Sequence, residues 1–255
     1  MFRLKFFRRK GMLTVTVLTL VFLLEFGLPK LSVIKYLNEI RNFKIFEKYT
    51  EKSYEFVEFM GLEKSKSVGF LMFAVLLLMV GAIQMLLRYG FGFVPMVLFQ
   101  VLVLYYCLGD STQTDYESVF IAKHEQAFGI LFWFLILGPM GAVMYKYLMV
   151  SRLTLSGKFK HQIALTDFIH GLAAWLPARI TGLIYALVGD FVSGFHCWQT
   201  CMQSGRMQSS QVLKDCGRAS LGSMPEAEGL GLVERAFIAW VVLSIIFALA
   251  IKIEV

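Results

Sequence analysis

Three long stretches without a charged residue dominate this 255-residue chain. Residues 68–87 run for 20 positions as VGFLMFAVLLLMVGAIQMLL, and residues 91–109 and 127–145 each provide 19 more uncharged positions. About 20 apolar residues, at a helical rise of about 1.5 Å per residue, cross the hydrocarbon core of a bilayer, which is about 30 Å thick. The sequence therefore predicts an all-α, polytopic integral membrane helical bundle.

Composition and charge agree with a membrane setting. Hydrophobic residues make up 57% of the chain and charged residues 17%, against about 45–50% and about 25% in soluble domains. The net charge is +7, and most of the basic residues lie between the apolar runs, where they suit anionic lipid headgroups. We therefore predict the lipid bilayer as a partner and exclude nucleic acid. The four cysteines form no recognisable disulfide framework.

The whole chain, residues 1–255, is predicted to form one membrane domain. The strong spans are expected at about 68–87, 91–109, 127–148 and 233–252, with a weaker membrane segment at 11–28. Residues 31–60 are expected to form an amphipathic, interfacial helix, or else to pack on other helices of the same protein. Residues 160–215 are expected to form polar or interfacial helices. Counts of Lys and Arg are compatible with either side of the membrane for the 150–232 region.

Two short motifs are predicted to have structural roles. Pro139 lies between Gly138 and Gly141 near the middle of the third span, so we expect a kink there and a close approach of a neighbouring helix. The second motif begins at Trp175, and its Pro177 fits the first turn of a helix. In that motif Arg179 would lie near the membrane boundary, where it could bind a phosphate or a carboxylate. The alternative is an interfacial Trp175 anchor with Arg179 on lipid headgroups.

These motifs carry a resemblance to a known family. The blocks LFWFLILGPMGAVMYK at 131–146 and WLPAR at 175–179, followed by YALVGDF at 185–191, resemble the AmpE family. Its members are inner-membrane proteins linked to the regulation of β-lactamase induction, within the wider CobD/CbiB superfamily of cobalamin biosynthesis. The resemblance implies a multi-pass protein of the bacterial inner membrane with a regulatory role in cell-wall stress and the antibiotic response.

One departure from the superfamily pattern concerns catalysis. Cobalamin-pathway members carry an Arg-Leu-Asp-Asp run, whereas this chain reads Arg-Leu-Thr-Leu at 152–155. Paired carboxylates for metal and phosphate are therefore missing, which favours a regulatory protein over an enzyme. Two alternatives stay open: a CobD/CbiB-like membrane amide ligase or a relative with another substrate, and a non-catalytic membrane scaffold or carrier.

The candidate ligand site is predicted from the same blocks. A small anionic ligand would be bound by five residues that we expect to share an interfacial cavity: Arg179, Lys146, Tyr145, Glu25 and Asp190. Glu25 is included because a carboxylate in a membrane segment usually faces a polar interior.

The remaining polar residues give weaker signals. His170 lies three residues after Asp167, a spacing that suits capping and packing as well as proton transfer. His196, Cys197 and Cys201 are metal-ligand types without an evident fourth ligand, so no metal and no cofactor is predicted.

Overall fold

The computed structural model describes residues 17–21, 45–59, 66–108, 119–154, 160–202, 209–225 and 228–253. Every element in these ranges is helical, which confirms the all-α prediction. After a short helical stretch at residues 17–21, the next helices are α3 (Ile45–Phe59), α4 (Lys66–Leu86), η2 (Leu87–Phe91), α5 (Phe93–Cys107), α6 (Val119–Lys123) and η3 (His124–Phe128). The remaining helices are α7 (Gly129–Leu137), α8 (Pro139–Thr154), α9 (Lys160–Val188), α10 (Phe191–Cys201), α11 (Ser209–Leu221) and α12 (Gly229–Ile253).

Among the residues that the structure describes, four helical segments are long and apolar enough to cross a membrane. They are Leu71–Phe91, Val119–Leu137, Ala164–Val188 and Gly229–Ile246. Two of them differ from the expected spans. The third is part of the 29-residue helix α9, although we expected only polar or interfacial helices over 160–215. The second begins eight residues earlier than expected, because the helix continues through residues 119–126, where His124, Glu125 and Gln126 are buried.

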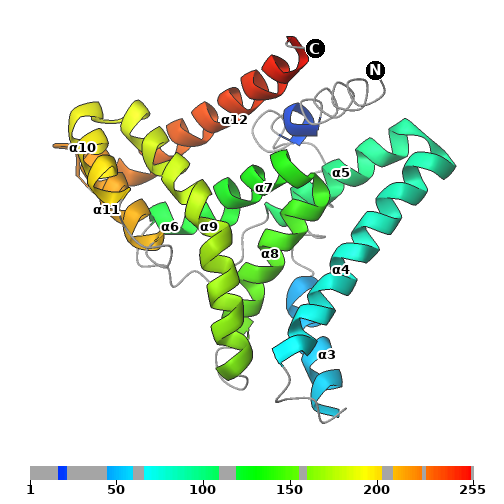
Figure 1. Ribbon diagram of the computed structural model, residues 1–255. Helices are drawn as coiled ribbons and strands as arrows, with labels where there is room; N and C mark the ends of the chain where they lie inside the picture. The colour runs from blue at the N-terminus through cyan, green and yellow to red at the C-terminus, as the bar shows by residue number, and fades with distance from the viewer. Residues whose placement is uncertain are drawn as a thin grey trace.

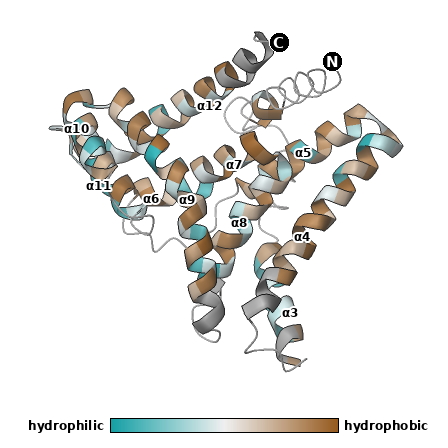
Figure 2. Cartoon of the chain, viewed as in Figure 1, coloured by the Kyte–Doolittle hydropathy of each residue, from teal (hydrophilic) through white to brown (hydrophobic). Residues whose placement is uncertain are grey.

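The expected span at 91–109 is shorter in the structure. Helix α5 has 15 residues, which at about 1.5 Å each reach about 22 Å, less than the bilayer core. Gly92 adopts φ +93° between η2 and α5, and the two arms α4 and α5 diverge from this turn (Figure 1). Only 6% of the membrane-spanning window of α4 is buried, and the helix is apolar along its length (Figure 2). One face of the helix, including Leu71, Leu78 and Met85, is exposed and therefore available to lipid.

The break at Gly138 is sharper than the kink we predicted. Gly138 has φ +70°, a left-handed conformation that ends α7, and Pro139 starts α8. The expected span 127–148 is therefore two helices that pack on each other. A Cβ at Gly141 would overlap the Trp133 carbonyl, so the glycine permits a close approach between α8 and α7, the two halves of the expected span, whereas we predicted the approach of a neighbouring helix.

Pro177 lies inside α9, not in a first helical turn as we expected. Because proline has no N–H, the carbonyl of Ala173, four residues earlier, has no partner within the helix. The indole Nε1 of Trp133 donates to this carbonyl at 3.0 Å. The proline thus provides an acceptor that joins α9 to α7.

Helix α8 is at the centre of the packing. It contacts α3, α4, α5, α7 and α9 (Figure 1). The described part of the 31–60 segment, α3, packs on α8 and α4, and the Tyr49 hydroxyl donates to the Met72 carbonyl at 3.1 Å. The packing alternative is therefore observed for 45–59. Glu25 and most of the 11–28 segment lie outside the described residues.

Helices α10 and α11 form a layer against the C-terminal half of α9 (Figure 1). Small residues allow this packing, because a Cβ at Gly189 would overlap the Ser220 carbonyl and one at Gly194 would meet Ala186. The backbone N–H of Asp190 also donates to the Ser220 carbonyl at 2.8 Å. The turn between α9 and α10 is thereby attached to the end of α11.

Candidate functional site

A cluster of polar side chains is buried where η3, α8 and α9 meet. His124 and Glu125 of η3, Tyr145 of α8 and His170 of α9 are all less than 7% exposed. His124 and Glu125 belong to a candidate span, and His170 belongs to another. Ionisable groups at such positions are costly, and they usually mark a functional site in a membrane protein.

The Glu125 carboxylate is the centre of this cluster. Its Oε2 accepts a hydrogen bond from the Tyr145 hydroxyl at 3.1 Å and lies 2.9 Å from Nε2 of His170. The Tyr145 ring fits because position 129 is a glycine, where a Cβ would overlap the ring. One carboxylate oxygen therefore joins three separate helices.

The ring of His170 has a definite proton arrangement. Arg152 Nη1 lies 3.2 Å from Nδ1 of His170, and a guanidinium nitrogen can only donate. Nδ1 is therefore the acceptor, and Nε2 carries the hydrogen that His170 donates to Glu125. His170 is neutral in this arrangement, and Arg152 supplies the positive charge opposite the Glu125 carboxylate.

The chain of contacts continues from Arg152 toward the surface. Its Nε lies 3.8 Å from Oδ1 of Asp167, and these two side chains are 35% and 39% exposed. The series Asp167, Arg152, His170, Glu125 and Tyr145 therefore runs from half-exposed groups to a fully buried hydroxyl. Because a guanidinium keeps its protons, the series cannot relay a proton through Arg152, but it can transmit a change in charge between the surface and the interior.

A π-helical turn places three adjacent polar residues, His124, Glu125 and Gln126, in the interior. His124–Phe128 interrupts the α-helix formed by α6 and α7, and π-bulges occur frequently at functional sites. Thr181 donates its hydroxyl hydrogen to the Pro177 carbonyl at 2.8 Å and lies 3.3 Å from His124 Nδ1. His124 therefore donates from Nδ1. Its Nε2 is a buried acceptor with no hydrogen-bond partner among the described residues.

The residues predicted from the sequence occupy different surroundings. Tyr145 is in the Glu125 cluster, whereas Lys146 is buried near Cys107 of α5. Asp190 is the N-cap of α10 and accepts from the backbone of Val192 and from the Ser193 hydroxyl, which donates at 2.7 Å. The Ser193 hydroxyl bond is the main cause that lowers the pKa of Asp190.

Arg179 is 2% exposed and does not extend to the surface. Its guanidinium lies 4.4 Å from the centre of the Trp175 ring and donates to the Trp175 carbonyl at 3.1 Å. Indole Nε1 of Trp198 donates to the Arg179 carbonyl at 2.8 Å. This burial disagrees with the alternative in which Trp175 anchors the chain and Arg179 binds lipid headgroups.

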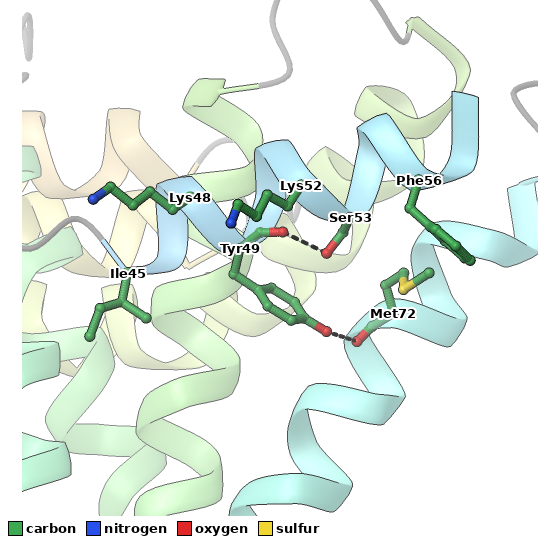
Figure 3. Close-up of a pocket in the computed structure, with 7 residues that line it drawn as sticks. All are labelled: Ile45, Lys48, Tyr49, Lys52, Ser53, Phe56 and Met72. Carbon is green, nitrogen blue, oxygen red and sulfur yellow. Dashed lines mark hydrogen bonds between the residues drawn. The ribbon is translucent and has the colours of Figure 1, made fainter. Parts of the chain in front are cut away.

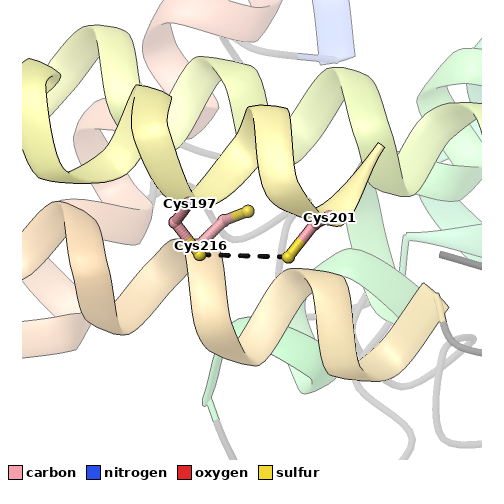
Figure 4. Close-up of side chains that lie close together, drawn as sticks. All are labelled: Cys197, Cys201 and Cys216. Carbon is pink, nitrogen blue, oxygen red and sulfur yellow. Dashed lines mark hydrogen bonds between the residues drawn. The ribbon is translucent and has the colours of Figure 1, made fainter. Parts of the chain in front are cut away.

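Three cysteines gather beside Arg179. Cys197 and Cys201 of α10 meet Cys216 of α11, with all three sulfur atoms within 4.8 Å of one another (Figure 4). Burial is the main cause that raises the pKa of Cys197, to about 11, and of Cys216. His196, which we had considered with them, is exposed and outside this group.

A separate open groove of about 470 Å³ lies between α3 and α4 (Figure 3). Its wall is mainly apolar, and Lys48 and Lys52 extend along α3 at its edge. The seven lining residues are Ile45, Lys48, Tyr49, Lys52, Ser53, Phe56 and Met72. It shares no residue with the Glu125 cluster.

Sequence reasoning missed Glu125, His124 and Arg152. We started the third span at residue 127 because charged residues precede it, which assigned His124 and Glu125 to a loop. An adjacent His and Glu at the start of an apolar run was the available signal. For His170 we considered Asp167 as partner, but the structure pairs His170 with Glu125 and Arg152.

Comparison with known families gives a match that includes every residue of this cluster except His124. A family model described as "Regulatory signalling modulator protein AmpE" matches residues 125–252, half of the chain. The chain belongs to the AmpE family. The match starts at Glu125 and includes Tyr145, Arg152 and His170. With its apolar helices, this AmpE family member is a multi-pass membrane protein of a regulatory signalling family, and helices of this kind place it in the lipid bilayer.

A more distant relative is a cobalamin biosynthesis protein, CobD, from Chromobacterium violaceum. It is 32% identical over 115 residues, which cover 42% of this chain. The match covers 35% of the length of that relative, so this chain spans about a third of it. No solved structure matches the chain.

Proposed function

We propose that this chain is an inner-membrane regulatory protein in β-lactamase induction and the response to cell-wall stress, and that it acts through the Glu125 cluster. The AmpE family match supports the regulatory role. The resemblance of the 131–146 and 175–179 blocks supports the link to β-lactamase induction. Several membrane-crossing helices support the localisation.

One observation carries the assignment to the Glu125 cluster. A single buried carboxylate oxygen, on Glu125 of η3, accepts hydrogen bonds from Tyr145 of α8 and His170 of α9. Protonation of Glu125 weakens its attraction to both donors, and a ligand that binds Arg152 withdraws the charge opposite it. Either event changes how tightly three helices are held together, and a regulator needs such a difference between two states.

The test is complementation of a deletion strain. Chains carrying Glu125→Gln or His170→Asn are expected to restore less β-lactamase induction than the native chain, measured as nitrocefin hydrolysis after exposure to a β-lactam. Membrane abundance is measured on the same samples. The matched control is Glu234→Gln, because Glu234 is an exposed glutamate in another candidate span.

Two outcomes would overturn parts of the proposal separately. Normal induction in the deletion strain would exclude the role in β-lactamase induction. If deletion abolishes induction but the Glu125→Gln chain restores it fully at normal abundance, the role in β-lactamase induction stands. The Glu125 cluster is then not the site of that role.

The CobD relative favours a second candidate function, a membrane amide ligase of the cobalamin type or with another substrate. The structure offers Asp167 near the cluster, paired with Arg152, but the adjacent carboxylates of the cobalamin pattern are missing from 152–155. Loss of cobalamin-dependent growth on deletion, with unchanged β-lactamase induction, would establish this candidate over the first.

A further inference from the structure

The three cysteines beside Arg179 have an arrangement that packing alone does not require. Cys197 and Cys201 lie one turn apart on α10, with their sulfur atoms 3.9 Å from each other. Cys216 comes from α11, and its sulfur completes a group within 4.8 Å (Figure 4). Helices α10 and α11 thus present thiols to one point.

The distances fit a tetrahedral metal centre. Zinc–sulfur bonds of about 2.3 Å place the sulfurs of a tetrahedral site about 3.8 Å apart. The Cys197–Cys201 separation already has this value to within a tenth of an ångström, and the third sulfur needs a shift of less than about 1 Å. A disulfide, with sulfurs about 2.0 Å apart, would use only two of the three thiols.

One positively charged side chain lies beside the group, and metal binding would displace the thiol protons. Cys201 and Cys216 lie close enough to Arg179 to interact electrostatically with its guanidinium. Three thiolates and one divalent cation leave one negative charge, which a single guanidinium neutralises. Cys216 is packed against Gly182 of α9, where a Cβ would lie 3.4 Å from its sulfur, so its position is constrained from behind.

We propose that Cys197, Cys201 and Cys216 bind one thiophilic divalent cation, Zn²⁺ in the first instance, at the junction of α10 and α11. No fourth His, Cys, Asp or Glu joins the group within the described part of the chain. Cys216 is buried, whereas the other two are partly exposed. The fourth position therefore faces outward and takes water or a small external ligand.

The experiment uses the full chain purified in detergent under reducing conditions without chelators. Metal content is measured by mass spectrometry after addition of Zn²⁺ and gel filtration, and Co²⁺ is used as a spectroscopic probe. The expected result is one Zn²⁺ per chain, with Co²⁺ producing thiolate charge-transfer absorption and the intense visible bands of tetrahedral coordination.

Variants identify the ligands. Cys216→Ser and the double variant Cys197→Ser/Cys201→Ser are expected to lose affinity by more than about tenfold, since loss of even an outer-shell partner has an effect of about this size. Cys107→Ser is the matched control, because Cys107 is a buried cysteine of α5 outside the group.

Three results would overturn the proposal. The first needs no variant: native protein retains no Zn²⁺ and gives no tetrahedral Co²⁺ spectrum, although thiol titration finds all four cysteines reduced. The second is native protein isolated with a disulfide within the group that cannot be reduced and loaded. The third is equal Zn²⁺ affinity in Cys216→Ser and native protein.

Discussion

Replacing Glu125 should destabilise the protein, and the size of the effect depends on which replacement is made. In Glu125→Ala the Tyr145 hydroxyl and the His170 Nε2–H both lose their acceptor inside the bundle. Leaving a buried donor unsatisfied costs about 1–3 kcal/mol, and two are left here. The remaining charge, on Arg152, is partly exposed and also paired with Asp167, so it adds little. We therefore expect Glu125→Ala to lower the free energy of unfolding by about 2–6 kcal/mol.

Glu125→Gln should cost less, because the amide oxygen can still accept both hydrogen bonds. What it loses is the charge, and bonds to charged groups contribute about 1.5–3 kcal/mol against about 0.5–1.5 kcal/mol for neutral ones. Hydrogen bonds between membrane helices average only about 0.6 kcal/mol. We expect a loss of about 1–2 kcal/mol for Glu125→Gln.

The assay is unfolding of the purified chain in mixed micelles, followed by tryptophan fluorescence, with Glu234→Gln as control. A double-mutant cycle with His170→Gln isolates the contact between Glu125 and His170. A coupling energy above about 1.5 kcal/mol would indicate a charge-assisted hydrogen bond between Glu125 and His170. A coupling energy of about 0.6 kcal/mol would indicate a hydrogen bond of the average strength between membrane helices. If Glu125→Ala unfolded like Glu234→Gln, the cluster would not hold the three helices together and the reasoning would be refuted.

Three further predictions follow from other contacts. Gly141→Ala should destabilise the chain by about 1–3 kcal/mol, because the new Cβ would overlap the Trp133 carbonyl. Gly90→Ala should not destabilise it, because there is open space around Gly90. Equal thermal stability of the two variants would contradict this prediction. Trp133→Phe should cost about 1–2 kcal/mol because the Ala173 carbonyl loses its donor, and an unchanged unfolding temperature would disprove it. Arg179→Ala should abolish the regulatory phenotype at near-normal membrane abundance, and normal induction would remove Arg179 as a functional candidate.

The membrane character of this protein can be read from the sequence, because it depends on local composition. An uncharged run such as 68–87 has to be helical in a bilayer, since its backbone polar groups find no water there. The positive φ of Gly138 and the start of a helix at Pro139 are likewise local properties, and the sequence indicated a disturbance at that place. Its extent, two helices and not one kinked helix, depended on how α8 packs.

The candidate site was decided by tertiary structure. Glu125 and His170 are 45 positions apart, and no periodicity relates them; they meet because a π-turn rotates Glu125 inward and α9 passes beside it. Cys216 joins Cys197 and Cys201 for the same kind of reason, since α11 folds back on α10. Burial of a charge is favourable only when partners from other helices are in place, and a sequence read along one helix at a time contains no information on those partners.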